Sequence, residues 1–176
     1  VTEFDVSMFN TKIAAQVLPK LERPERPAAF LRRKLRSYRT AAGNYLDNRR
    51  RAKQGREDFR PLYFIWTVLR TCNFLCTYCD DHQGRKYPEL PNDGVLDTEQ
   101  GLRLLSIMRS RTPSVYFAGG EPTLRKDLPA LTREARDLGY FPIIINTNGS
   151  AVDRLVRLPA WRTWLADTDV VVVSLD

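Results

Sequence analysis

Apolar segments recur at an even interval along the second part of the chain. Their residues are 62–69, 114–118, 141–146 and 169–175. The last three are centred near residues 116, 144 and 172, and a stretch with helical features follows each of the first three. Because these segments are apolar without alternation, they are typical of buried parallel strands, and we expect helices on both faces of the sheet. The pattern predicts the α/β class, built from repeated βα units.

Helix boundary signals lie between these segments. Asp97, with Gln100 three residues later, matches a capping box and predicts the start of one helix. Asp127 is expected to cap the next helix, and Gly139 to end it. Ser150 is expected to cap a third helix. Each predicted strand is therefore followed by a predicted helix, as a βα repeat requires.

The first sixty residues differ from the rest in charge. Residues 1–60 carry 15 Lys and Arg against 7 Asp and Glu, a net charge of +8, whereas residues 61–176 carry 13 against 14, a net charge of −1. Helical periodicity is present at 5–21 and 28–50, and two prolines lie between these stretches. We therefore predict a basic helical extension and linker at 1–60, followed by the α/β body at 61–176.

The predicted helix at 28–50 is amphipathic. Its apolar stripe is formed by Leu31, Leu35, Tyr38, Ala42 and Tyr45, and Arg32, Arg33, Lys34, Arg36 and Arg39 occupy other faces. We expect the stripe to pack against the body and the basic face to remain in solvent. The alternatives are contact with a membrane surface and binding of nucleic acid, and of these we expect no nucleic acid.

All three cysteines of the chain lie within eight residues, directly after the first predicted strand. Cys72, Cys76 and Cys79 are too close together for a disulfide framework, so we expect a reducing, cytoplasmic setting. Thiolates gathered in one loop suit a soft metal centre. Three of them would leave one iron of a four-iron, four-sulfur cluster open to a ligand. The alternative is a zinc site in which His82, the only histidine, is the fourth ligand.

Other unusual residues also follow predicted strands. Gly119-Gly120-Glu121-Pro122 follows the second strand, Thr147-Asn148-Gly149 follows the third, and Ser174 and Asp176 end the fourth. Taken singly, each of these short segments is typical of an ordinary turn or strand end. Parallel strands, however, end at one edge of a sheet, where ligands bind. The sequence therefore predicts one pocket lined by four segments.

These motifs together resemble those of the radical S-adenosylmethionine (SAM) enzymes. The resemblance is carried by C-N-F-L-C-T-Y-C at 72–79 and G-G-E-P at 119–122, and more weakly by I-N-T-N-G at 145–149 and V-S-L-D at 173–176. It covers residues 61–176 and is greatest to the branch that includes peptide-modifying, sulfatase-maturing and cofactor-biosynthesis enzymes.

The resemblance implies a fold, two cofactors and a reaction. The fold would be a partial (β/α) barrel with four of the family's six βα units. Cys72, Cys76 and Cys79 would each ligate one iron of a 4Fe-4S cluster, and SAM would bind the open iron. An external flavodoxin- or ferredoxin-like donor would supply an electron, and SAM would be cleaved to a 5′-deoxyadenosyl radical that takes a hydrogen atom from a substrate. The substrate stays open between a peptide, a lipid precursor and a small metabolite.

The resemblance also implies residues that bind SAM. They are Tyr78, Gly119, Gly120, Glu121, Pro122, Asn148, Ser174 and Asp176. Tyr78 would flank the adenine. The glycine pair would let backbone carbonyls approach the amino group, with Glu121 as its charged partner. Asn148, Ser174 and Asp176 would contact the ribose or the carboxylate, and no catalytic residue is implied beyond the cluster.

The predicted barrel is incomplete in this sequence. The chain starts at Val1 and stops at the end of the fourth predicted strand, two βα units short of the family's barrel. We therefore expect a fragment of a longer enzyme, one that is inactive alone. Its fourth strand would be an open, valine-rich edge.

Overall fold

A parallel four-stranded sheet forms the centre of the molecule. The computed structural model describes residues 25–79, 94–155 and 157–174. The strands follow one another in the order of the sequence: β1 (Phe64–Thr67), β2 (Val115–Ala118), β3 (Ile143–Thr147) and β4 (Val170–Val173). All three neighbouring pairs are parallel. The predicted α/β class and the even βα repeat are confirmed, and the sheet is that of a partial (β/α) barrel.

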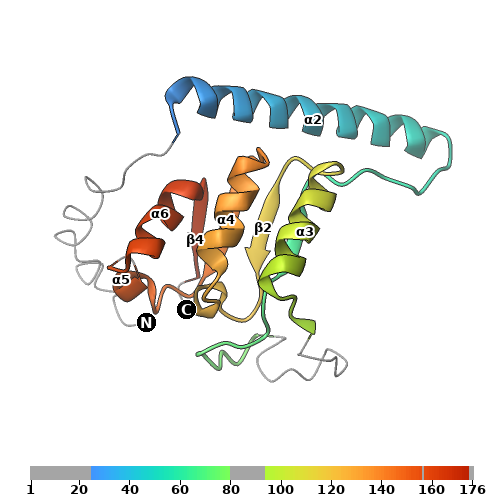
Figure 1. Cartoon of the computed structure of the whole chain (residues 1–176). Coiled ribbons are helices and arrows are strands. Elements are labelled where there is room, and N and C mark those ends of the chain that lie inside the picture. Colours follow the sequence, from blue (N-terminus) through green and yellow to red (C-terminus); the bar gives the residue numbers. More distant parts are fainter. Residues whose placement is uncertain (1–24, 80–93, 156, 175–176) are drawn as a thin grey trace, which may run out of the picture.

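Three helices cover one face of this sheet. α3 (Thr98–Arg109), α4 (Leu128–Asp137) and α6 (Pro159–Asp167) lie side by side there (Figure 1). Between sheet and helices lies the core, which includes Phe117, Ile145, Leu105, Leu131 and Trp164. The opposite face keeps exposed side chains such as Ile65 and Val172. Helices on both faces were therefore a wrong prediction for the described residues, because in a barrel the second face of the sheet points inward.

Two of the predicted helix boundaries are confirmed. The Asp97 carboxylate accepts a hydrogen bond from the Gln100 backbone N–H at 2.8 Å, and the Gln100 side chain accepts one from the Asp97 N–H at 3.0 Å, so α3 begins with a complete capping box. Helix α4 ends at Asp137 with Leu138 as its C-cap residue, and Gly139, with φ of 84°, follows directly. A positive φ of this size favours glycine and ends the helix.

Two other boundary predictions differ from the structure. Asp127 occupies the predicted N-cap position directly before α4, but its carboxylate makes no capping bond and instead contacts Arg125 at 2.7 Å and Thr98 at 2.8 Å. The helix expected from Ser150 starts at Val152 and ends at Leu155 as α5. Helix α6 then begins at Pro159, because proline disfavours helical backbone in the residue before it.

A single long helix, α2 (Pro27–Lys53), crosses the amino-terminal ends of the strands (Figure 1). It confirms the helix predicted at 28–50, and because it continues to Lys53 it also includes residues that were predicted to belong to the linker. The helix predicted at 5–21 lies outside the described residues. No helix in the described part of the chain is long and apolar enough to cross a bilayer.

The face of α2 that packs against the body is polar, contrary to our prediction. Arg33, Ser37 and Asn44 are its buried residues, whereas Leu35 and Tyr38 of the apolar stripe are 52% and 53% exposed. The reason lies in what the body offers at this end. Strands and helices begin and end here, so the surface presents backbone carbonyls and carboxylates that need hydrogen-bond donors.

The buried polar residues of α2 supply those donors. The Asn44 amide donates to the backbone oxygens of Pro61 at 2.9 Å and Arg111 at 3.2 Å. The Ser37 hydroxyl lies 3.5 Å and 3.4 Å from the backbone oxygens of Pro113 and Gly139. These acceptors lie close to the starts of β1, β2 and β3, so α2 fastens the amino-terminal ends of three strands together.

Arg33 connects α2 to β4. Its guanidinium forms a two-pronged ion pair with Asp169, with both N–O distances at 2.8 Å, and donates to the Tyr140 backbone oxygen at 2.6 Å. It also pairs with Glu25 at 3.0 Å. Although burial alone would lower the pKa of Arg33, the hydrogen bonds that its guanidinium donates to the Asp169 and Glu25 carboxylates raise that pKa. The guanidinium therefore remains charged although it is buried.

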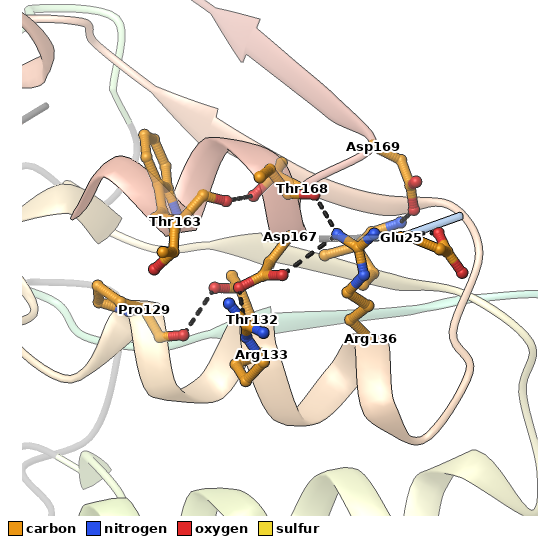
Figure 2. A network of polar contacts seen from close by, with 12 residues as sticks. Glu25, Pro129, Thr132, Arg133, Arg136, Thr163, Asp167, Thr168 and Asp169 are labelled. Atoms are coloured by element: carbon orange, nitrogen blue, oxygen red, sulfur yellow. Dashed lines mark hydrogen bonds and ion pairs between the residues drawn. The ribbon is translucent and has the colours of Figure 1, made fainter. Parts of the chain in front are cut away.

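The ionic contacts continue from Glu25 into the helices of the body, as Figure 2 shows. Arg136 of α4 pairs with Glu25 at 3.1 Å and with Asp167 of α6 at 3.2 Å. Arg133 pairs with Asp167 at 2.7 Å. The network therefore joins α4, α6 and the segment before α2, and through Arg33 it reaches the start of β4.

Candidate functional site

The loops that follow the strands meet at the end of the sheet opposite α2 (Figure 1). Cys72 lies in the loop after β1, Gly119 directly follows β2, and Asn148 directly follows β3. Ser174 follows β4, where its N–H donates to the Thr147 backbone oxygen at 2.9 Å. Asp176 lies outside the described residues. The contacts below join the first three of these loops.

The two glycines of the G-G-E-P segment allow the cysteine loop to approach. The N–H of Gly120 donates to the Leu69 oxygen and that of Glu121 to the Thr71 oxygen, both at 2.9 Å. A Cβ on Gly119, where φ is 133°, would lie 2.3 Å from the Leu69 oxygen, and one on Gly120 would lie 2.2 Å from the Thr71 oxygen. Any larger side chain would therefore push the start of the cysteine loop away.

Glu121 is buried at the centre of the site and joins the loops after β2 and β3. Only 1% of the residue is exposed. One carboxylate oxygen accepts hydrogen bonds from the Thr123 N–H at 3.0 Å, from the Thr123 hydroxyl, and from the Thr147 hydroxyl at 2.6 Å. The other accepts the Asn148 N–H at 2.7 Å. A buried carboxylate with four donors is held in one position, and so are the two loops that supply them.

Sequence reasoning did not name Thr123, and it placed Thr147 in a segment of the pocket without giving it a role. Both contribute hydroxyl groups to the carboxylate of Glu121, and both are buried. A signal was present in each case, since Thr123 follows Glu121 by two residues and Thr147 is the last residue of a strand. Threonine is, however, common in strands and turns, so the residue type alone does not reveal the contact.

The cysteine loop carries three free thiols. Cys72 and Cys76 are partly buried and Cys79 is exposed, and the Cys79 N–H donates to the Cys76 oxygen at 3.0 Å, which closes a turn between the last two cysteines. The Phe74 N–H points at the Cys72 sulfur from 3.4 Å. Three thiols in one loop, with an N–H donor directed at the Cys72 sulfur, are a donor set of the type that holds iron–sulfur clusters.

The side chain of Asn148, the residue directly after β3, also reaches Cys72. The Asn148 amide donates to the Asn73 side-chain oxygen at 3.0 Å and lies 3.7 Å from the Cys72 sulfur. The Asn73 amide in turn donates to the Ser150 hydroxyl at 2.8 Å. Neither Asn73 nor Ser150 was predicted to belong to the site. Together these contacts tie the cysteine loop to the segment that follows β3.

The remaining predicted site residues differ in exposure. Tyr78 is 63% exposed on the cysteine loop, and Pro122 is buried at the start of a short 3-10 turn, η4 (Pro122–Leu124). An exposed ring next to the thiols is available for stacking on a ligand.

The zinc alternative finds no support in the structure. Within the described ranges, no three Cys, His, Asp or Glu side chains converge as ligands of a single metal ion. His82, the fourth ligand of that hypothesis, lies outside those ranges.

The comparisons with known proteins agree on one family. The family model described as "Radical SAM superfamily" matches residues 66–175. The chain is 39% identical over 99 residues to the Fe-coproporphyrin III synthase of Methanosarcina barkeri. It is 33% identical over 112 residues to a probable GTP 3′,8-cyclase of Saccharolobus islandicus, and 35% identical over 82 residues to the 7,8-dihydro-6-hydroxymethylpterin dimethyltransferase of Methanocaldococcus jannaschii.

The matched segments are a part of each relative. They cover 56%, 62% and 47% of this chain but only 23%, 33% and 16% of the three relatives, in the same order. The described chain thus corresponds to at most about a third of the length of these proteins. Because the family match begins in β1, the basic helix α2 precedes the matched region.

Proposed function

The chain belongs to the radical SAM superfamily, and on that premise we propose that residues 61–176 form the cluster- and SAM-binding part of a radical SAM enzyme. When both are bound, the 4Fe-4S cluster passes one electron to SAM, and the radical released by the cleavage of SAM abstracts a hydrogen atom from a substrate. Cys72, Cys76 and Cys79 are the proposed cluster ligands. The protein contributes position and shielding around these groups.

The contact of three loops in one place supports this proposal most directly. The chain leading to Cys72 lies against Gly119 and Gly120 with no space for a side chain, and the Asn148 amide reaches the Cys72 sulfur. The first proposed cluster ligand, Cys72, and the proposed SAM contacts at Gly119, Gly120 and Asn148 are thereby held next to each other. Prearranged groups of this kind lower the cost of binding.

Glu121 has a proposed role that combines charge with position. Its carboxylate is already occupied by donors from Thr123, Thr147 and Asn148, so it fixes the backbone of both loops. Its negative charge, buried behind those loops, favours the amino group of SAM in the same pocket. Contacts of Tyr78, Pro122, Ser174 and Asp176 with SAM remain part of the proposal.

Metal analysis of cysteine variants tests the cluster. The full reading frame that contains this chain is purified anaerobically and reconstituted with iron and sulfide, and iron, sulfide and zinc are quantified. We expect iron loading in the parent, no cluster in Cys72→Ala, Cys76→Ala or Cys79→Ala, and normal loading in the control variant His82→Ala. Stoichiometric zinc in the parent, or loss of iron in His82→Ala, would refute the assignment.

Cleavage of SAM tests the reaction. Under a strong reductant, the loaded parent should release 5′-deoxyadenosine, and each cysteine variant should release none. Absence of 5′-deoxyadenosine from a fully loaded parent with bound SAM would contradict the proposed activity while leaving the cluster assignment intact.

The substrate proposal rests on the relatives alone. Their names refer to an iron coproporphyrin, to GTP and to a dihydropterin, so of the open substrate classes we favour a small metabolite. A low-molecular-mass extract should then raise 5′-deoxyadenosine formation, and a protein extract should not; the reverse result would contradict this choice.

Two further parts of the proposal concern the surroundings of the enzyme. We assign the electron that cleaves SAM to an external flavodoxin- or ferredoxin-like donor, because members of the radical SAM superfamily generally need an electron donor. We assign a cytoplasmic location, because the three cysteines are free thiols. A contact with a membrane surface is a separate proposal that rests on α2.

A further inference from the structure

The outer face of α2 carries an exposed apolar stripe. We define this outward stripe by the residues Leu31, Leu35, Ala42, Tyr45 and Leu46; Tyr38 lies at its edge, where its ring packs edge-to-face on Phe141 of the body. Leu31 is 53% exposed, Leu35 52% and Leu46 61%. The spacing of three, four and seven residues places them along one side of the helix for several turns. A contiguous apolar surface of this kind marks an interaction site.

The outward stripe cannot turn inward without breaking contacts. Arg33, Ser37 and Asn44, on the opposite side of α2, hold the helix to the starts of the strands. Rotating the helix to bury Leu35 would carry the Arg33 guanidinium away from Asp169 and leave a buried carboxylate without its partner. The stripe therefore faces away from the body as long as α2 is docked.

Basic side chains border the outward stripe. Arg32, Arg36, Arg39, Arg49, Arg50 and Lys53 are exposed on α2. Arg32, Arg36 and Arg39, together with Leu35 and Thr40, line a shallow surface depression. None of these basic residues forms an ion pair with a carboxylate in the part of the chain that the structure describes.

The basic residues on the body side of the molecule behave differently. Arg33, Arg51, Arg125, Arg133 and Arg136 each form an ion pair with a carboxylate. The only acidic residue of α2, Asp47, pairs with Arg51 and Arg60. The exposed cations of α2 that form no ion pair among the described residues therefore border the outward stripe, where they complement an anionic partner, whereas Arg154, Arg157 and Arg162 are exposed elsewhere on the body.

We propose that the outward stripe and its arginine border dock α2 in the plane of a membrane rich in anionic phospholipid. The leucines would enter the boundary between headgroups and acyl chains, and the arginines would bind lipid phosphates. Tyr45, whose ring is amphipathic, suits the same depth. At about 40 Å in length, a helix of 27 residues lying flat offers this contact over its whole outer face.

Other partners fit these features less well. A second copy of the chain would bring two arginine borders against each other, at an electrostatic cost. Nucleic acid would use the arginines but leave the leucines in water. The position of α2 also suits a membrane, because it lies at the end of the sheet opposite the cysteine loop, so that docking leaves the site open to solvent (Figure 1).

Vesicle flotation tests the proposal directly. The full reading frame is mixed with vesicles of phosphatidylcholine, or of phosphatidylcholine with about a third phosphatidylglycerol, at two salt concentrations. We expect binding to the anionic vesicles only, and weaker binding at high salt. The triple variant Arg32→Gln, Arg36→Gln, Arg39→Gln should lower the partition coefficient by about a hundredfold, since each basic residue near an anionic surface contributes about 1 kcal/mol.

Two variants distinguish this contact from general charge attraction. Arg154→Gln, Arg157→Gln, Arg162→Gln removes the same charge from exposed positions elsewhere and should leave binding unchanged within about twofold. Leu35→Gln with Leu46→Gln retains all charges and should lower binding at least tenfold.

Four results would overturn the proposal. They are equal binding to both vesicle types, equal loss in the two arginine triples, no effect of the leucine changes, and an outer face of α2 that is protected from labelling without lipid. The last would mean that a second copy or another part of the full protein covers the outward stripe. Iron loading, measured in parallel, should be unchanged in every variant, which separates this test from that of the cluster.

Discussion

Replacing Arg33 tests whether polar contacts determine the orientation of α2. Arg33→Met keeps most of the volume of the side chain but removes its charge and its hydrogen bonds to Asp169, Glu25 and the Tyr140 oxygen. The three acceptors stay behind at a buried interface. We therefore expect α2 to detach from the body more often, while the sheet and its core remain folded.

The expected free-energy cost of Arg33→Met depends on the hydrogen-bond partners that Asp169 and Glu25 retain without the guanidinium. Asp169 retains the Ile143 N–H at 2.8 Å, and Glu25 retains Arg136 at 3.1 Å. The full cost of two uncompensated carboxylates therefore does not apply. Breaking a buried pair costs about 3–5 kcal/mol, and with these remaining partners we expect the lower end, about 3 kcal/mol. The opening equilibrium of α2 would then rise about a hundredfold.

Hydrogen exchange of α2, measured by mass spectrometry in the full reading frame, reads out this opening locally. Amides of α2 in Arg33→Met should lose about a hundredfold in protection, and amides of β2 and β3 should not change. Arg32→Met is the matched control, because Arg32 is exposed on the neighbouring face, and it should change protection by less than about threefold. Equal effects of the two substitutions would refute the orientation of α2 described here.

Three further predictions concern the site. Gly120→Ala should reduce iron loading at least tenfold although every cysteine is present, because the added Cβ would overlap a backbone oxygen of the cysteine loop. The control Gly43→Ala, whose Cβ would have open space around it, should leave iron loading unchanged. Equal iron contents in the two variants would contradict this prediction. Glu121→Gln should weaken SAM binding about tenfold to a hundredfold in calorimetry and leave the cluster in place, and unchanged affinity would count against its role. Asn148→Ala should lower the reduction potential of the cluster in an electron paramagnetic resonance titration, because it removes an N–H from the Cys72 sulfur; an unshifted potential would exclude that contact.

The strands, most helices and the common edge of the site could be predicted from the sequence because they depend on local patterns. The spacing of apolar segments indicated the strands, and Asp97 with Gln100 indicated a capping box that the structure contains. The cysteine spacing and the G-G-E-P segment indicated the loops of the site. In each case the residues that carry the signal are neighbours in the sequence.

The face that α2 presents to the body could not be predicted, because it depends on distant residues. Helical periodicity shows that α2 has an apolar side and a polar side, but not which side the body requires. That choice follows from acceptors such as Asp169 and the Pro61 and Gly139 oxygens, which meet only after the sheet has formed. Asp127 was misassigned for the same reason, since its partner Thr98 is 29 residues away.

The contacts of Asn148 link the two halves of the site energetically. Its backbone N–H is fixed by Glu121 in the proposed SAM pocket, and its side chain reaches Asn73 and Cys72 in the cysteine loop. A group that fixes the Cys72 sulfur therefore also restrains Asn148, and through it the loop that Glu121 holds. Because coupling between two binding events is reciprocal, SAM bound beside Glu121 would in turn stabilise the cluster-bound form of the cysteine loop. Under the proposed function, the buried carboxylate of Glu121 would support both cofactor sites without ligating the cluster.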